Sequence, residues 1–182
     1  MNILTKILAR HSAPIVALLA FTIAIPSCST RGASLDASKD TASTRTLAVR
    51  LERGPCYGRC AEYTAQVFDD GLIEFDGRRN VKALGVQRRK ISVSAVRALQ
   101  QRFADAGFAK ADTAYVEGAA GCGRYLPDGP RTVLDLRIGT MIKSVHHDAG
   151  CTGAPRYLQT LASQVDSVAQ TSAWITGTGA NR

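Results

Sequence analysis

The sequence lacks a hydrophobic run long enough to cross a membrane, and it lacks the motifs of common catalytic sites. Its longest apolar segment, residues 13–25, has 13 residues, well short of the roughly 20 that a membrane-spanning helix needs. No serine stands in a G-x-S-x-G nucleophile elbow, and the glycine-rich stretch 118–123 lacks the lysine of a phosphate-binding loop. The residue patterns therefore predict no permanent spanning helix and point to no particular reaction.

Acidic residues are absent from the first 27 positions, where Lys6 and Arg10 precede the apolar run. A basic stretch followed by a short apolar run is typical of a signal peptide. The run ends in Ile25-Pro26-Ser27-Cys28, which resembles the lipobox of bacterial lipoproteins, whose cysteine thiol is acylated before cleavage. We predict a lipoprotein signal peptide over residues 1–27 and lipidation at Cys28. Pro26 departs from the small residue usual at that position, so cleavage to a soluble periplasmic product is the alternative.

The compartment decides how the charge of the chain is interpreted. Ser29 follows Cys28, which by resemblance to the sorting rule of Gram-negative lipoproteins implies the outer membrane, facing the periplasm. The formal charge of +8 falls to +6 when residues 1–27 are removed, because two basic residues and no acidic ones leave with them. We expect such an exported protein to bind no nucleic acid and to meet anionic lipid, lipopolysaccharide or an acidic protein surface instead.

Aromatic residues are absent from residues 29–45, which contain four Ser, three Thr and a single Leu. Such a segment cannot form a core, so residues 28–45 are predicted to be the lipidated cysteine and a flexible tether, with a reach of about 20 to 25 Å. A single domain is expected over residues 46–175, followed by a disordered tail over residues 176–182.

The apolar periodicity of this domain predicts an α+β fold. Alternation of apolar and polar residues predicts strands at 46–52, 63–67, 72–75, 86–91, 132–138 and 141–148. Helical spacing predicts one helix from an N-cap at Ser92 to Ala106 and a second with Pro155 in its first turn. Two successive units of strands followed by a helix favour an antiparallel sheet of about six strands with both helices packed on one face. Trp174 and Ile175 are expected to fold back onto the core.

The most specific motif is Gly54-Pro55-Cys56-Tyr57-Gly58-Arg59-Cys60-Ala61-Glu62-Tyr63, between the first two predicted strands. It resembles the signature G-P-C-x-G-x-C-P-x-Y of a family of bacterial envelope proteins known only as a domain of unknown function, with Ala61 in place of the usual proline. The resemblance extends over nearly all of residues 46–175. It implies a fold and a compartment but no activity.

Four cysteines remain when Cys28 is set aside, and in an oxidising compartment we expect them to pair. Of the three possible pairings, the spacing favours Cys56–Cys60 with Cys122–Cys151, because the first pair lies in one turn and the second flanks the last predicted hairpin. Three residues separate Cys56 from Cys60, whereas thioredoxin-like motifs have two, which disfavours redox chemistry. Metal binding is the remaining alternative for these cysteines.

His146-His147-Asp148 is the one cluster that suggests metal binding or proton transfer. Neighbouring residues of a strand point to opposite faces, so the two histidines cannot bind one ion without ligands from elsewhere. We therefore expect no metal and no cofactor, and a binding or structural module without catalytic activity. The alternative is a periplasmic hydrolase or thiol/redox factor that uses His146 or His147 with the cysteines.

Acidic residues are also absent between positions 78 and 90, where six basic residues stand: Arg78, Arg79, Lys82, Arg88, Arg89 and Lys90. One interpretation is a solvated strand face without a function. The other is a binding edge for anionic envelope components, such as lipid phosphates or peptidoglycan carboxylates, or for an acidic envelope protein. We take these six residues as the candidate binding site, and the sequence predicts no particular oligomeric state.

Overall fold

The computed structural model describes residues 45–175. The predicted signal peptide, Cys28 with the tether as far as residue 44, and the predicted tail over residues 176–182 lie outside the described residues. Within residues 45–175, no helix is long and apolar enough to span a membrane.

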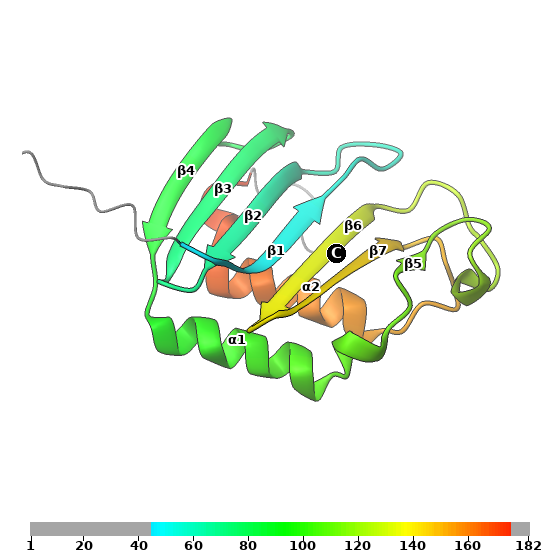
Figure 1. Ribbon diagram of the computed structural model, residues 1–182. Coiled ribbons are helices and arrows are strands. Elements are labelled where there is room, and N and C mark those ends of the chain that lie inside the picture. The colour runs from blue at the N-terminus through cyan, green and yellow to red at the C-terminus, as the bar shows by residue number, and fades with distance from the viewer. Residues whose placement is uncertain (1–44, 176–182) are drawn as a thin grey trace, which may run out of the picture. The chain divides into compact units, whose positions relative to one another are not determined.

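A seven-stranded sheet forms the centre of the domain (Figure 1). Its strands are β1 (Leu47–Arg53), β2 (Glu62–Phe68), β3 (Leu72–Arg79), β4 (Gly85–Lys90), β5 (Ala114–Tyr115), β6 (Arg131–Ile138) and β7 (Met141–Asp148). Their order across the sheet is β4-β3-β2-β1-β6-β7-β5. The predicted α+β class is confirmed. The sheet has seven strands in place of about six, and it is mixed because β5 runs parallel to β7.

The strand β5 could not be predicted because it contains only two residues, too few to show an alternating pattern. The hairpin between β2 and β3 was predictable from its turn residues. Gly71 has φ +84°, and a Cβ atom there would lie 2.3 Å from the backbone oxygen of Ile91. Only glycine fits both the conformation and this close approach.

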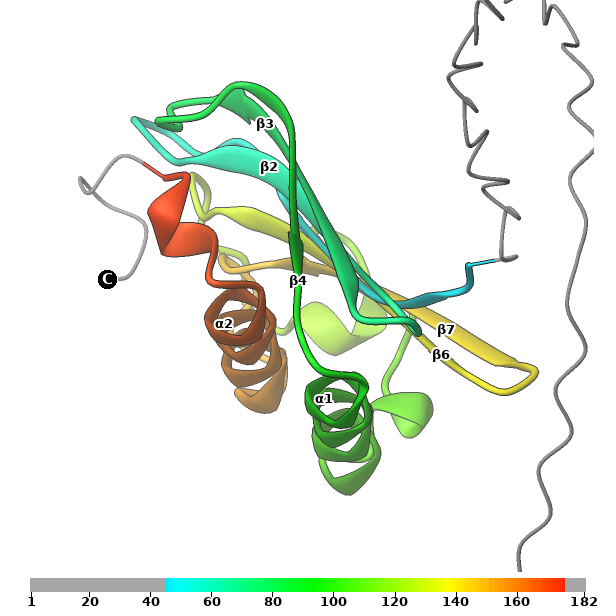
Figure 2. The same cartoon turned by 90° about the vertical axis from the view of Figure 1, so that its left-hand side faces the viewer.

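Two helices, α1 (Val93–Asp105) and α2 (Tyr157–Ala169), pack on the same side of the sheet (Figure 2). The hydroxyl of Ser92 accepts a hydrogen bond from the amide of Ala95 at 3.2 Å, as expected of an N-cap. Pro155 lies just before α2 and not in its first turn, and its carbonyl accepts a hydrogen bond from the amide of Leu158 at 3.1 Å. Both helices are therefore found where the sequence predicts them, with a small correction at the start of α2.

The core lies between the helices and the sheet face toward them, here called the helix face. Its largest fully buried side chains come from strands and helices together: Leu51, Ile73, Phe75, Leu134 and Leu136 with Leu99, Phe103, Phe108, Leu158 and Leu161. Trp174 packs on Phe75 with ring centroids 5.1 Å apart, and Ile175 pairs with Val81. The predicted return of this C-terminal segment to the core is confirmed.

The opposite sheet face, here called the open face, carries no helix (Figure 2). Its central rows are mostly polar, as in the ion pair between Arg50 Nη1 and Asp135 Oδ2 at 2.9 Å. One apolar and one solvated face are typical of antiparallel sheets.

Candidate functional site

The motif that carries the family resemblance forms a loop at one end of the sheet, here called the signature loop (residues 54–61). It connects β1 to β2, and the disulfide Cys56–Cys60 closes it with a Cα–Cα distance of 5.8 Å. The amide of Gly54 donates a hydrogen bond to the carbonyl of Arg131 at 2.8 Å. The amide of Tyr57 donates a hydrogen bond to the carbonyl of Asp128 at 3.4 Å. The signature loop is therefore held both by its own crosslink and by the chain that leads into β6.

Tyr57 lies at the tip of the signature loop, and its side chain is 85% exposed. It is the most exposed of the large hydrophobic residues of the described chain. A tyrosine buries a large area when it meets a partner, so Tyr57 on this constrained loop is suited to anchor a contact.

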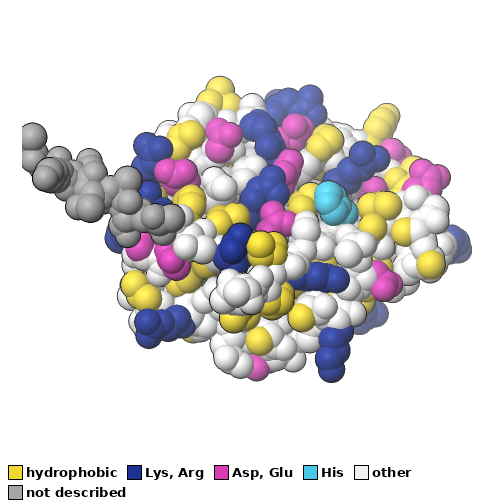
Figure 3. Space-filling view, in the orientation of Figure 1, with side chains coloured by type: hydrophobic (Ala, Val, Ile, Leu, Met, Phe, Trp, Pro, Cys, Tyr) yellow, Lys and Arg dark blue, Asp and Glu magenta, His cyan; other side chains and the backbone are white. Residues whose placement is uncertain are grey.

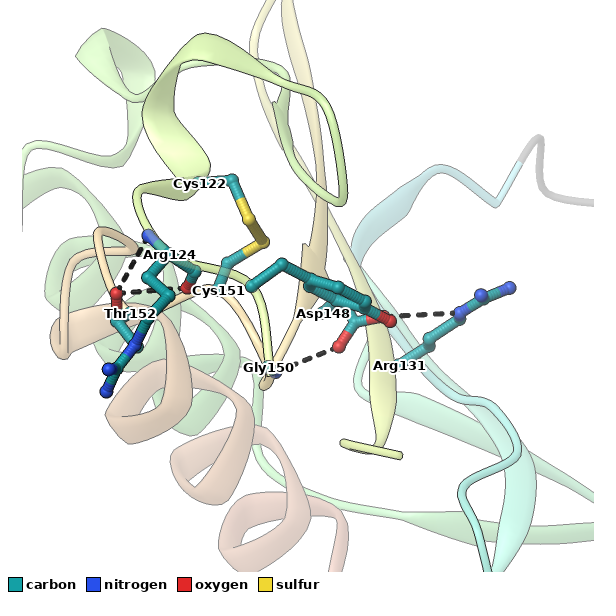
Figure 4. The surroundings of a disulfide bond; sticks show 8 residues. Cys122, Arg124, Arg131, Asp148, Gly150, Cys151 and Thr152 are labelled. Carbon is teal, nitrogen blue, oxygen red and sulfur yellow. Dashed lines mark hydrogen bonds and ion pairs between the residues drawn. A yellow bond between two sulfur atoms is a disulfide. The ribbon is translucent and has the colours of Figure 1, made fainter. Parts of the chain in front are cut away.

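A second disulfide, Cys122–Cys151, fastens the adjacent loops with a Cα–Cα distance of 4.5 Å (Figure 4). Both of its cysteines are buried. The amide of Thr152 donates to the carbonyl of Arg124, and the Thr152 hydroxyl donates to the same carbonyl, each at 3.0 Å. Both disulfides have the predicted pairing, so the four cysteines of the described chain are all crosslinked.

Asp148, at the end of β7, is a buried carboxylate beside this disulfide (Figure 4). It accepts hydrogen bonds from the amide of Gly150 at 2.9 Å, the hydroxyl of Tyr125 at 3.2 Å and the Nε of Arg131 at 3.4 Å. Desolvation and the charge of Asp148 raise the pKa of Tyr125, so this hydroxyl stays protonated and donates. With three donors around it, Asp148 orders the loops and is poorly placed to act as a general base.

The signature loop and the loop before β6 border an open hollow of about 620 Å³. Its lining residues are Pro55, Cys56, Tyr57, Glu117, Tyr125, Pro127, Asp128, Gly129, Arg131 and Asp148. Arg131 and Asp148 form an ion pair at 3.4 Å, whereas Glu117 and Asp128 form none within residues 45–175. The hollow is therefore lined by aromatic rings and prolines, with an excess of negative charge.

A groove of about 710 Å³ lies on the other side of the signature loop, along α2. Arg53 Nη2 pairs with Asp166 Oδ2 at 2.6 Å, and Asp166 also accepts from the hydroxyls of Tyr63 and Thr171. Burial and the charge of Asp166 raise the pKa of Tyr63, which keeps its hydroxyl a donor. This network connects the end of the sheet to α2, and its charges compensate each other.

The two histidines lie next to each other on β7 but differ in exposure, with His146 exposed and His147 half-buried. His146 pairs with Val133 and His147 with Thr132 across the strands, so they face opposite sides of the sheet as predicted. In the part of the chain that the structure describes, no group of three or more His, Cys, Asp or Glu is placed to hold a metal ion.

Burial lowers the pKa of His147, and the positive charge of Arg53 adds to this effect against the opposing charge of Asp148. The unfolded chain therefore binds a proton at His147 more tightly than the folded chain does. The contribution of His147 to the free energy of unfolding is full above the ordinary histidine pKa of about 6.5 and is lost as the pH falls below it. We expect His147→Gln to flatten the fall in melting temperature between about pH 7 and pH 5. His146→Gln is the matched control, and an equal effect of both substitutions would contradict this assignment.

The predicted basic edge is largely neutralised by acidic residues from neighbouring strands and turns. Its ion pairs join Arg78 to Glu52 (3.1 Å), Arg79 to Glu62, Arg88 to Glu74 (2.8 Å) and Lys90 to Asp70 (3.0 Å). Arg89 points to the helix face, where its guanidinium lies 4.0 Å from the centre of the Trp174 ring. Among the six residues, Lys82 alone forms neither an ion pair nor a stacking contact within residues 45–175.

Figure 3 shows that basic and acidic side chains lie interspersed over the open face, as the ion pairs of the basic residues require. Opposite charges in contact cancel much of each other's field beyond a few ångströms, and salt screens the remaining field over about 8 to 10 Å. The acidic partners are remote in sequence, and only strand pairing brings them close to the six basic residues, whose role as a binding edge stays a prediction. Neither the exposure of Tyr57 nor the hollow beside it was predicted from the sequence, although a tyrosine between two cysteines of one turn was a signal for both.

A comparison with known proteins identifies the family of the chain. No curated protein matches the chain. The family model of a domain of unknown function, DUF6438, matches residues 47–169. This match begins with the first residue of β1 and ends with the last residue of α2, so it includes both disulfides and the whole sheet. The chain therefore belongs to the family of the domain of unknown function DUF6438.

Proposed function

We propose that this protein is a cell-envelope lipoprotein whose domain is a binding module without catalytic activity. A lipid on Cys28 would hold it at the outer membrane, and the signature-loop end of the sheet would bind a partner. The observation that carries the binding role is Tyr57, which is 85% exposed on a loop closed by a disulfide. An exposed aromatic residue on a rigid loop loses little conformational entropy on binding, which is the profile of an interface hot spot.

The chemistry of the hollow indicates the kind of partner. Its rings and prolines offer apolar contact area, while Glu117 and Asp128 have no basic partner within the described residues. We infer that the partner is an envelope protein that presents an apolar side chain next to a basic one. The neutralised basic edge is a weaker candidate, because an anion there would compete with four acidic side chains already in place.

We do not propose the hydrolase or redox alternative. A thiol/redox factor of the thioredoxin type has two residues between its cysteines and a helix N-terminus beside them, whereas three residues separate Cys56 from Cys60 in a loop between two strands. A hydrolase that uses His146 or His147 with a cysteine needs a free thiolate as its nucleophile, and the four cysteines of residues 45–175 are all in disulfides.

Photo-crosslinking in native cells tests the binding site. We expect a benzoylphenylalanine at position 57 of the full chain to give a discrete crosslinked protein, and Tyr57→Ala to weaken binding of that protein about tenfold or more, as for a hot spot. Val93 is the control position, because it is exposed at the start of α1, at the opposite end of the sheet. No product at position 57, or the same products at both positions, would show that the signature-loop end is not the binding surface.

Intact mass of the membrane-extracted mature protein tests the anchor. We expect a chain that begins at Cys28 and carries a diacylglyceryl group, and we expect Cys28→Ala to leave the protein without an acyl chain. A parent protein recovered in the soluble periplasmic fraction with another N-terminus would disprove the anchor, with Pro26 as the obvious cause. That result would not affect the crosslinking test at Tyr57.

A further inference from the structure

The strand pairing brings the start of the domain and the β6–β7 hairpin to the same end of the sheet, here called the tether end. Val49 in β1 pairs with Leu136 in β6, so the first residues of β1 lie level with the last residues of β6. The amide of Thr46, just before β1, donates to Asp69 Oδ1 at 3.1 Å in the β2–β3 turn. The chain therefore enters the domain at the end of the sheet that is opposite to the signature loop.

The β6–β7 hairpin projects at the tether end. The pairing of β6 with β1 stops at Leu136, whereas its pairing with β7 continues to Ile138 and Met141. Figure 2 shows this tip beyond the neighbouring strands, on the side where the chain enters β1. The tip, residues 137–142, thus has no strand hydrogen-bonded to it on its β1 side.

Apolar side chains are exposed on both faces of this tip. Ile142 is 62% exposed on the open face, where it pairs with Arg137, and Ile138 is 39% exposed on the helix face, where it pairs with Met141. A protein partner that docks on one face of the hairpin would leave the other isoleucine in water. Immersion of the tip in an apolar medium covers both, so the arrangement fits a lipid surface better than a second protein.

The charges around the tip have the sign that a bilayer with anionic lipids attracts. Residues 137–143 contain Arg137 and Lys143 and no acidic residue. Within residues 45–175, Arg137 forms no ion pair, and Lys143 Nζ donates only to the carbonyl of Ala111. Basic side chains with long aliphatic stems can reach phosphate groups while neighbouring isoleucines enter the interface.

We propose that the β6–β7 tip inserts Ile138 and Ile142 among the headgroups of a phospholipid bilayer, with Arg137 and Lys143 near the lipid phosphates. This inference rests on the proposed anchor at Cys28, because two partly exposed isoleucines alone bind a bilayer weakly. A tether that starts in the membrane holds the tip near it at an effective concentration on the order of millimolar, which makes the weak contact persistent. The seven residues of β1 then place the signature loop roughly 20 Å or more from the tip, facing away from the lipid.

Fluorescence quenching in vesicles tests this orientation. The parent contains a single tryptophan, Trp174, which gives the baseline. The full lipidated chain carrying Ile142→Trp is reconstituted in phosphatidylethanolamine–phosphatidylglycerol vesicles with brominated acyl chains. We expect the added fluorescence to shift to shorter wavelength and to be largely quenched. Leu84→Trp is the matched control, because Leu84 is 66% exposed in the β3–β4 loop at the signature-loop end, and we expect its fluorescence to stay unquenched.

The outcomes separate this inference from the proposed anchor. If the chain carries the acyl group and neither variant is quenched, or if Leu84→Trp is quenched as strongly as Ile142→Trp, the membrane-facing tip is wrong and the anchor stands. If intact mass shows no acyl group, the anchor is wrong, and the same comparison is made with an N-terminal histidine tag bound to nickel-chelating lipid. Quenching confined to Ile142→Trp would then still support the tip, and its absence would overturn it.

Discussion

Replacing Cys122 and Cys151 together by serine is expected to lower the free energy of unfolding by about 3 to 4 kcal/mol, the chain-entropy value for a loop of this length. The sequence separation of the two cysteines is 29 residues, and both side chains are buried. Their disulfide holds the loops that surround Asp148, where a Cβ atom on Gly150 would lie 1.9 Å from the carbonyl oxygen of Leu126. Loss of the disulfide therefore releases a long loop in the unfolded chain and loosens close packing in the folded one. Urea unfolding of the oxidised proteins measures the difference.

The paired control is replacement of Cys56 and Cys60 by serine. Their separation is only 4 residues, so we expect a loss of about 2 kcal/mol, smaller than that of the first pair. Double substitutions avoid free thiols, which would otherwise form new disulfides. An equal or larger loss for Cys56 and Cys60 would show that the signature loop, and not the Asp148 loops, dominates the stability of this end of the sheet.

Removal of the Asp166 carboxylate is expected to destabilise the fold about as much as loss of the Cys122–Cys151 disulfide. Asp166 is buried on α2, and it receives hydrogen bonds from Arg53, Tyr63 and Thr171. Asp166→Asn keeps the shape of the side chain but leaves the half-buried Arg53 guanidinium without its counter-charge. Breaking a buried ion pair in this way costs about 3 to 5 kcal/mol. Denaturant unfolding at neutral pH measures this loss, which would also weaken the attachment of α2 to the sheet.

The control for Asp166→Asn is Glu74→Gln, which also removes one carboxylate from an ion pair. The partner of Glu74 is Arg88, whose side chain is exposed on β4. Water solvates that guanidinium when the pair is broken, so we expect a loss of about 1 kcal/mol or less. If the two substitutions have equal effects, the Arg53–Asp166 pair is a surface contact in solution and its role in holding α2 is disproved.

Local patterns were sufficient for most of the elements. Alternation along β1 and β6, the hydroxyl of Ser92 before α1 and the turn at Gly71 are properties of a few consecutive residues, and each was predictable. The disulfide pairing was predictable for a related reason. Cys56 and Cys60 share one turn, and a hairpin necessarily returns its two ends to the same edge, near Cys122 and Cys151.

The candidate site was much less predictable, because it depends on which distant segments meet. The basic run from Arg78 to Lys90 is free of acids in sequence, yet its acidic partners arrive from β1, β2, β3 and the β2–β3 turn through strand pairing. The neighbours of Arg89 on β4 are exposed, and its basic side chain gave no reason to expect otherwise. In the structure the ring of the C-terminal Trp174 stacks on its guanidinium. The exposure of Tyr57 likewise follows from how two loops pack and not from its neighbours in the sequence.

The sequence by itself determined the class of the fold and favoured the two disulfides, because these follow from periodicity, turn chemistry and the spacing of cysteines, while the family was indicated by the resemblance of residues 54–63 to a known motif. Only the tertiary structure decided that β1 pairs with β6, which joins the two predicted units into one sheet. It also decided that Asp166 meets Arg53 across 113 residues and that the β6–β7 tip lies where the chain enters the domain. The physical reason is that the register between distant strands sets these contacts, and that register comes from the packing of the whole core.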